Sequence, residues 1–118
     1  MKLRVREMPP VWIELQDGGK VHVKRLPTSR IDRLRKLNTG LDGELDLTSF
    51  RKEMKKEQFL GWQGMEDPLS GEDIPFTEEN LFGAIEHDIE FVNEVDAKLN
   101  QAYGRVKEKQ GKNSESTP

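Results

Sequence analysis

The two histidines are the side chains best suited to chemistry at neutral pH, because imidazole both binds metals and transfers protons. His22 and His87 lie in different predicted elements, and neither has an evident third ligand nearby. His87 and Glu90 are three positions apart, a spacing that could chelate a metal, but a protein metal site needs more ligands than these two. We interpret His87 as a histidine at a helix boundary among solvated acids. We predict no metal and no cofactor.

Three acidic residues, Asp42, Glu44 and Asp46, alternate with other residues as they do at the start of a calcium-binding loop. The glutamate that closes such a loop is missing from its required position. We therefore expect no calcium site here, and we interpret residues 41–46 as a loop between helices.

The chain also lacks the motifs of common catalytic sites. It has no cysteine, which excludes thiol catalysis, thiolate metal sites and disulfide bonds. Gly18-Gly19 is not followed by the lysine and hydroxyl pair of a phosphate-binding loop, and Ser70 is interpreted as a turn residue. Carboxylates are plentiful, but the sequence singles out no pair for acid–base catalysis. We predict that the protein is not an enzyme.

The composition limits the size of the core. Of 118 residues, 33% are apolar and 35% are charged, so the apolar share is below that of an average globular chain. We expect a single compact domain over residues 1–107, helped by a partner or by self-association, and a disordered tail over 108–118. The longest apolar run, residues 11–13, is too short to span a membrane, and the N-terminus does not resemble a signal peptide.

Charge is divided unevenly along the chain. Residues 1–40 contain ten Lys and Arg against four Asp and Glu, whereas residues 41–118 contain nine against eighteen. One interpretation is that each half solvates its own face, or that the two halves attract each other within the fold. The other is a bipolar surface that stacks head to tail or holds a basic partner.

Alternation of apolar and polar residues predicts a β-hairpin near the N-terminus. The alternation runs on both sides of Asp17-Gly18-Gly19, a turn sequence typical of the link between two antiparallel strands. We predict this hairpin over residues 11–25.

Helical patterns follow the hairpin. Four helices are predicted over residues 29–39, 48–60, 78–87 and 89–107. The segment 61–77 has no helical period and is interpreted as an acidic loop that apolar side chains anchor to the core. The expected fold class is therefore α+β and predominantly helical.

The last two predicted helices have clear signals. Thr77 and Asp88 are expected to cap them. The fourth helix has an apolar stripe suited to packing on the domain or on a second copy of the chain. The stripe consists of Val92, Val95, Leu99, Ala102 and Val106.

Four short motifs follow one another between residues 59 and 103. They are Trp62-Gln63-Gly64, Glu66-Asp67, Gly71-Glu72 and Ile74-Pro75-Phe76-Thr77-Glu78-Glu79-Asn80. In this order they resemble tail assembly chaperones of long-tailed bacteriophages, in which a Trp-x-Gly element precedes acidic residues, a glycine turn, and an (Ile/Leu)-Pro-Phe-Thr-x-Glu-Asn start to a helix. The resemblance implies a non-enzymatic protein of the host cytoplasm. It would bind the tape measure protein, help recruit tail tube subunits, and be absent from the mature virion.

Apolar side chains in this region are the candidate contacts for such a partner. They are Phe59, Trp62, Met65, Phe82, Ile85, Phe91, Val95 and Leu99. A holdase for a long helix needs an apolar groove rimmed by charge, which the third and fourth helices could form together. The alternative for each of these residues is a place in the core of the domain.

Two further functions remain open. The chain could be a structural head–tail or tail component that stays in the virion. It could also be a small nucleic-acid-binding regulator, because basic residues are concentrated on the predicted hairpin and first helix. The isoelectric point near 5.5 and the acidic second half make nucleic-acid binding the less favoured of the two.

Overall fold

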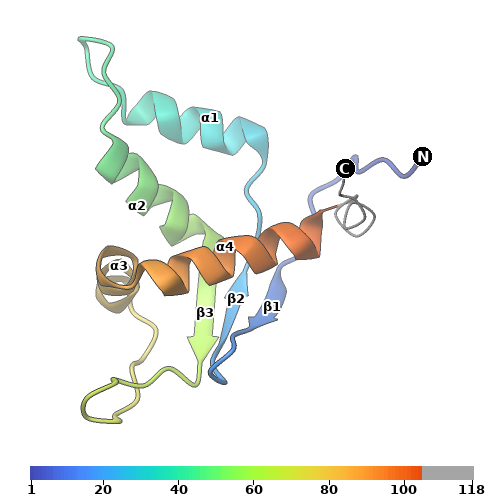
Figure 1. Ribbon diagram of the computed structural model, residues 1–118. Helices are drawn as coiled ribbons and strands as arrows, with labels where there is room; N and C mark the ends of the chain where they lie inside the picture. Colours follow the sequence, from blue (N-terminus) through green and yellow to red (C-terminus); the bar gives the residue numbers. More distant parts are fainter. Residues whose placement is uncertain (105–118) are drawn as a thin grey trace, which may run out of the picture.

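The computed structural model describes residues 1–104 and has an α+β fold, which confirms the predicted class (Figure 1). The elements follow in the order β1 (Val11–Glu14), β2 (Lys20–Val23), α1 (Thr28–Leu37), α2 (Leu47–Gln58), β3 (Phe59–Gln63), α3 (Glu78–His87) and α4 (Ile89–Tyr103). The predicted continuation of the last helix to residue 107 and the predicted disordered tail over 108–118 lie outside the described residues.

The predicted β-hairpin is confirmed. Strands β1 and β2 pair antiparallel, with Trp12 opposite His22 and Ile13 opposite Val21. Gly18 in the connecting turn has a φ of 103°, a left-handed conformation that glycine adopts without steric cost.

A third strand, β3, extends the hairpin to a three-stranded antiparallel sheet in the order β1-β2-β3. The sequence predicts a helix up to residue 60, but α2 ends at Gln58 and β3 begins at the next residue. Phe59 and Trp62 lie opposite Val23 and Val21, so these pairs share one face of the sheet. The chain forms a strand from Phe59 onward because pairing with β2 and burial of the Phe59 ring outweigh the weak helical pattern there.

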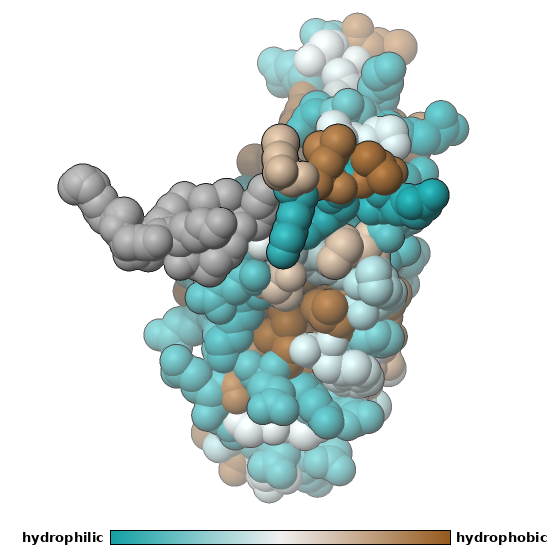
Figure 2. Space-filling model, turned by 90° about the vertical axis from the view of Figure 1, so that its right-hand side faces the viewer, coloured by the Kyte–Doolittle hydropathy of each residue, from teal (hydrophilic) through white to brown (hydrophobic). Residues whose placement is uncertain are grey.

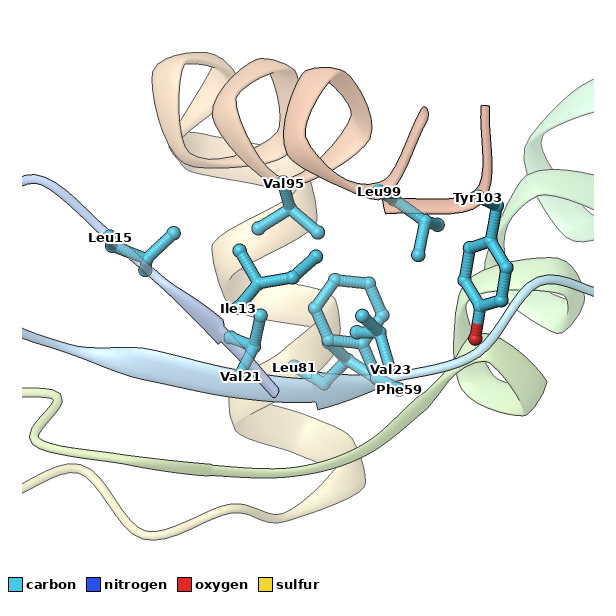
Figure 3. Close-up of a cluster of buried hydrophobic side chains, with 9 residues drawn as sticks. All are labelled: Ile13, Leu15, Val21, Val23, Phe59, Leu81, Val95, Leu99 and Tyr103. Carbon is cyan, nitrogen blue, oxygen red and sulfur yellow. The ribbon is translucent and has the colours of Figure 1, made fainter. Parts of the chain in front are cut away.

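The main core lies between the sheet and the last two helices, with α4 running across one sheet face (Figures 1 and 3). Its buried side chains come from the β-hairpin, β3, α3 and α4. They are Ile13, Leu15, Val21, Val23, Phe59, Leu81, Val95, Leu99 and Tyr103. We refer to the sheet with α3 and α4 as the body.

The buried stripe of α4 differs from the predicted one at its C-terminal end. Tyr103 is buried where the pattern assigned Ala102, which is exposed. The Tyr103 hydroxyl donates a hydrogen bond to the Pro9 carbonyl at 2.7 Å, and Arg4 donates to the Tyr103 carbonyl at 2.7 Å. These bonds hold the N-terminal segment against the end of α4. The predicted stripe residue Val106 lies outside the described part of the chain.

Helices α1 and α2 form a helical hairpin, residues 28–58, that extends away from the sheet (Figure 1). Its small core consists of Leu34 and Phe50 together with Leu26, which precedes α1. Arg30 donates two hydrogen bonds to the carboxylate of Glu57, at 2.7 and 2.5 Å, and so joins α1 to α2.

Side chains cap α2, α3 and α4, whereas α1 begins after Pro27 without a side-chain cap. Thr77 accepts a hydrogen bond from the Asn80 amide, and Asp88 accepts one from the Phe91 amide, as predicted. Helix α2 begins at Leu47, one residue before its predicted start, because Asp46 caps it through the amide of Ser49.

Two ion pairs join the basic helix α2 to the acidic helices of the body. Lys55 contacts Asp96 of α4 at 2.7 Å, and Lys56 contacts Glu78 of α3 at 2.8 Å. All four of these residues belong to the acidic half of the sequence, residues 41–118, whereas the pair between Arg30 and Glu57 joins that half to the basic half, residues 1–40. Within residues 1–104, no helix is both long enough and apolar enough to cross a membrane.

Candidate protein-binding surface

Three of the eight predicted contact residues are buried in the main core. The exposed fractions are 4% for Phe59, 1% for Val95 and 6% for Leu99. In this fold they have almost no surface from which to contact a partner. The helical stripe was correctly recognised as apolar, but it is covered by the sheet of the same chain (Figure 3).

Phe82, Ile85 and Phe91 are half-buried and pack against the same core. The ring of Phe91 lies 6.0 Å from that of Phe59 and 6.2 Å from that of Trp62, both within range of an aromatic contact. The predicted groove between α3 and α4 is therefore largely used by intramolecular packing.

Trp62 belongs to a structural unit that includes the motif residues of the following segment. Its indole Nε1 donates a hydrogen bond to the Ile74 carbonyl at 2.8 Å, and its ring meets that of Phe76 nearly edge-on at 5.1 Å. The side chain of Asn80 donates to the Pro75 carbonyl at 3.0 Å. The motif thus fixes how the chain enters α3, and this explains its order along the sequence.

Met65, the last predicted contact, is half-buried against the β-hairpin turn. A Cβ atom at Gly19 would come within 2.9 Å of the Met65 sulfur and 3.3 Å of the Gly64 carbonyl oxygen, so the turn packs closely against this side chain. The acidic loop that follows is ordered by Asp67, whose carboxylate accepts hydrogen bonds from the Leu69 and Ser70 amides. These bonds lower the pKa of Asp67.

Exposed leucines gather instead at the end of the helical hairpin. We call residues 37–47 the leucine tip, because Leu37, Leu41, Leu45 and Leu47 all have exposed side chains there. The exposed fraction of Leu37 is 65%, and Leu41 is fully exposed. The sequence predicts a helix up to residue 39 and a loop over residues 41–46, and it did not single out these leucines as an exposed group. The available signal was a leucine at every fourth position from 37 to 45.

Hydrogen bonds order the leucine tip. The Asp46 amide donates to the Asn38 carbonyl at 2.8 Å, and the Gly40 amide donates to the Glu44 carbonyl at 2.9 Å. Asp42, which resembled a calcium ligand, accepts a hydrogen bond from the Glu44 amide at 3.0 Å. Asp46 caps α2, and its bonds from Ser49 lower its pKa. The alternating acids of the sequence therefore shape a turn.

A second exposed surface is the sheet face opposite α4. The rings of Trp12 and His22 stack there at 4.6 Å with an angle of 8° between their planes. The Lys20 ammonium lies 5.6 Å from the centre of the Trp12 ring, within the range of a cation–π contact. Gly61, opposite His22, leaves open space on the same face.

The rest of the visible surface is mostly polar. Figure 2 shows a side that is largely hydrophilic, with apolar residues in small separate areas. In the part of the chain that the structure describes, no group of three or more His, Asp or Glu side chains gathers where a metal ion could bind. Comparisons with protein-family models, curated proteins and solved structures found no significant match.

Proposed function

We propose that this chain is a tail assembly chaperone of a long-tailed bacteriophage. It binds the tape measure protein transiently, helps recruit tail tube subunits, and catalyses no reaction. It acts in the cytoplasm of the bacterial host and is left out of the mature virion. The proposal starts from the sequence pattern between residues 59 and 103.

The observation that carries the proposal is the contact between the separate parts of that pattern. Trp62 of the Trp-x-Gly element binds the Ile74 carbonyl and contacts Phe76 of the element that precedes α3. Thr77, in the same element, caps α3. The motifs of the pattern therefore contact one another in the fold. Such contacts support a common origin for the whole pattern, which separate turn and cap signals would not do.

The accessible surface supports transient binding. Burying a leucine side chain contributes about 1.5–3 kcal/mol, whereas association of two proteins costs roughly 4–15 kcal/mol. Four exposed leucines on a small tip therefore give weak attachment per copy. Weak attachment suits a chaperone that must leave its client when the tail tube assembles.

Co-expression with the tape measure protein of the same phage tests the proposal. We expect the tape measure protein to remain soluble and to co-purify with this chain, and mass spectrometry of purified virions to lack the chain. Stoichiometric presence in virions would instead identify a structural tail or head–tail component. Failure to bind or solubilise the tape measure protein would reject the chaperone role.

A second candidate function, binding of single-stranded nucleic acid, is favoured by the exposed Trp12–His22 stack beside Lys20. Fluorescence anisotropy with a labelled oligonucleotide at low and high salt tests it. Salt-sensitive binding that Trp12→Ala abolishes would support it. Absence of binding at low salt would remove it.

A further inference from the structure

We propose that the leucine tip is the surface on which the tape measure protein docks, and that the docked segment is an amphipathic helix with basic residues beside its apolar stripe. This inference rests on the proposed function. It assigns the contact to residues 37–47 in place of the groove between α3 and α4.

The position of the tip makes it accessible to a long client. The helical hairpin extends away from the sheet, and the tip lies at its far end (Figure 1). Helix α1 packs mainly against α2, so the tip is supported by the hairpin alone. A surface that projects in this way can contact a long helix from one side and does not need to enclose it.

Charge identifies the chemistry of the client. The loop at the tip, residues 38–46, carries the three acids Asp42, Glu44 and Asp46 and no basic residue. Among the ion pairs of the described residues, none involves these three carboxylates. Asp42 and Asp46 accept hydrogen bonds from nearby amides but keep their negative charge without a cationic partner among these ion pairs. Leucines interspersed with such carboxylates complement an apolar stripe flanked by lysine or arginine.

The order of the tip favours binding without folding. Backbone hydrogen bonds from Asp46 to Asn38 and from Gly40 to Glu44 close its turn. The leucine side chains therefore project from an ordered backbone. Binding to a preordered surface loses less conformational entropy than binding to a flexible loop.

The tip offers four exposed leucine side chains, so the proposed contact with one copy of the chain is small.

Binding of a helical tape measure fragment to the full chain, measured by fluorescence anisotropy, tests this assignment. We expect the double variant Leu37→Ser/Leu41→Ser to bind about tenfold more weakly than the wild type. The matched control is Leu60→Ser/Leu69→Ser, which removes two exposed leucines elsewhere and should change affinity less than about twofold. Circular dichroism and thermal unfolding should show that both variants fold as the wild type does, because all four side chains are exposed.

A charge variant tests the chemistry separately. Glu44→Lys should weaken binding of the basic fragment several-fold at low salt, whereas Glu72→Lys in the acidic loop should have little effect. Equal affinities for the two leucine double variants would overturn the docking assignment while leaving the chaperone role intact, because the wild type would still bind. A wild-type chain that binds no tape measure fragment would reject the proposed function and this inference together.

Discussion

The body and the helical hairpin are built on very different amounts of buried surface. Nine buried side chains form the core of the body, whereas three form the core of the helical hairpin. The body covers its apolar residues with its own sheet and helices, but the helical hairpin leaves four leucines exposed at its tip. Docking of a partner on the leucine tip, as proposed, would therefore place binding in a different region from most of the buried core.

The largest expected effect comes from a cavity in the body. Phe59→Ala should lower the free energy of unfolding by about 3–5 kcal/mol, because it removes a buried ring that packs under α4 and contacts Phe91. Phe50→Ala makes the equivalent change in the helical hairpin. It should mainly loosen that hairpin, leaving the body folded.

Two measurements separate these outcomes. Urea denaturation followed by tryptophan fluorescence reports on the body, since both Trp12 and Trp62 lie in the sheet. Amide hydrogen exchange reports on α1 and α2. If Phe50→Ala destabilised the body as much as Phe59→Ala, the two regions would be one cooperative unit, and the comparison would be wrong.

An intermediate effect is expected at the junction of the two regions. Lys55 is buried, with 7% of its surface exposed, and its ammonium contacts Asp96 at 2.7 Å. Asp96→Asn leaves this buried charge without a carboxylate and should cost about 1–3 kcal/mol in the free energy of unfolding.

The pair between Lys56 and Glu78 provides the matched control, because both of its side chains are more than half exposed. Glu78→Gln should change the free energy of unfolding by less than about 1 kcal/mol in the same denaturation experiment. If Asp96→Asn and Glu78→Gln lowered the free energy of unfolding equally, burial of Lys55 would not make its ion pair more important for stability.

The sequence predicted the parts of this fold whose signals are local. The β-hairpin was readable from alternation around Gly18, and the caps at Thr77 and Asp88 from the residue types that accept amide hydrogen bonds. Strand β3 was not predictable in this way. Gly61 interrupts its apolar pattern, and it becomes a strand only by pairing with β2, more than 30 residues earlier.

The candidate contact surface was harder to predict than the fold, for a physical reason. Apolar periodicity marks residues that are buried somewhere, but it does not say against what. Val95 and Leu99 therefore met the criteria for a partner-binding stripe and are part of the core. The exposure of Leu41 depends on the turn that follows α1, and residue types alone do not place that turn away from the body.

The smallest expected effect is a difference in acid sensitivity between the two regions. Hydrogen bonds from Arg30, together with its charge, lower the pKa of Glu57 in the helical hairpin. In the body, the pKa of Glu94 is lowered by its bond from Lys98 and by the Gln16 amide. Because both pKa values are lower in the folded state, both contributions to stability are present near neutral pH. They are lost as the pH falls below the ordinary glutamate value of about 4.3.

Because the core of the helical hairpin is the smaller of the two, we expect this region to open first on acidification. We expect hydrogen exchange of α1 to accelerate at a higher pH than the loss of tryptophan fluorescence from the body. Glu57→Gln should make the exchange of α1 less dependent on pH, and Glu94→Gln should do the same for the body alone. If one variant flattened the acid response of both regions, the helical hairpin would have no independent stability, and the leucine tip could not be treated as a separate binding element.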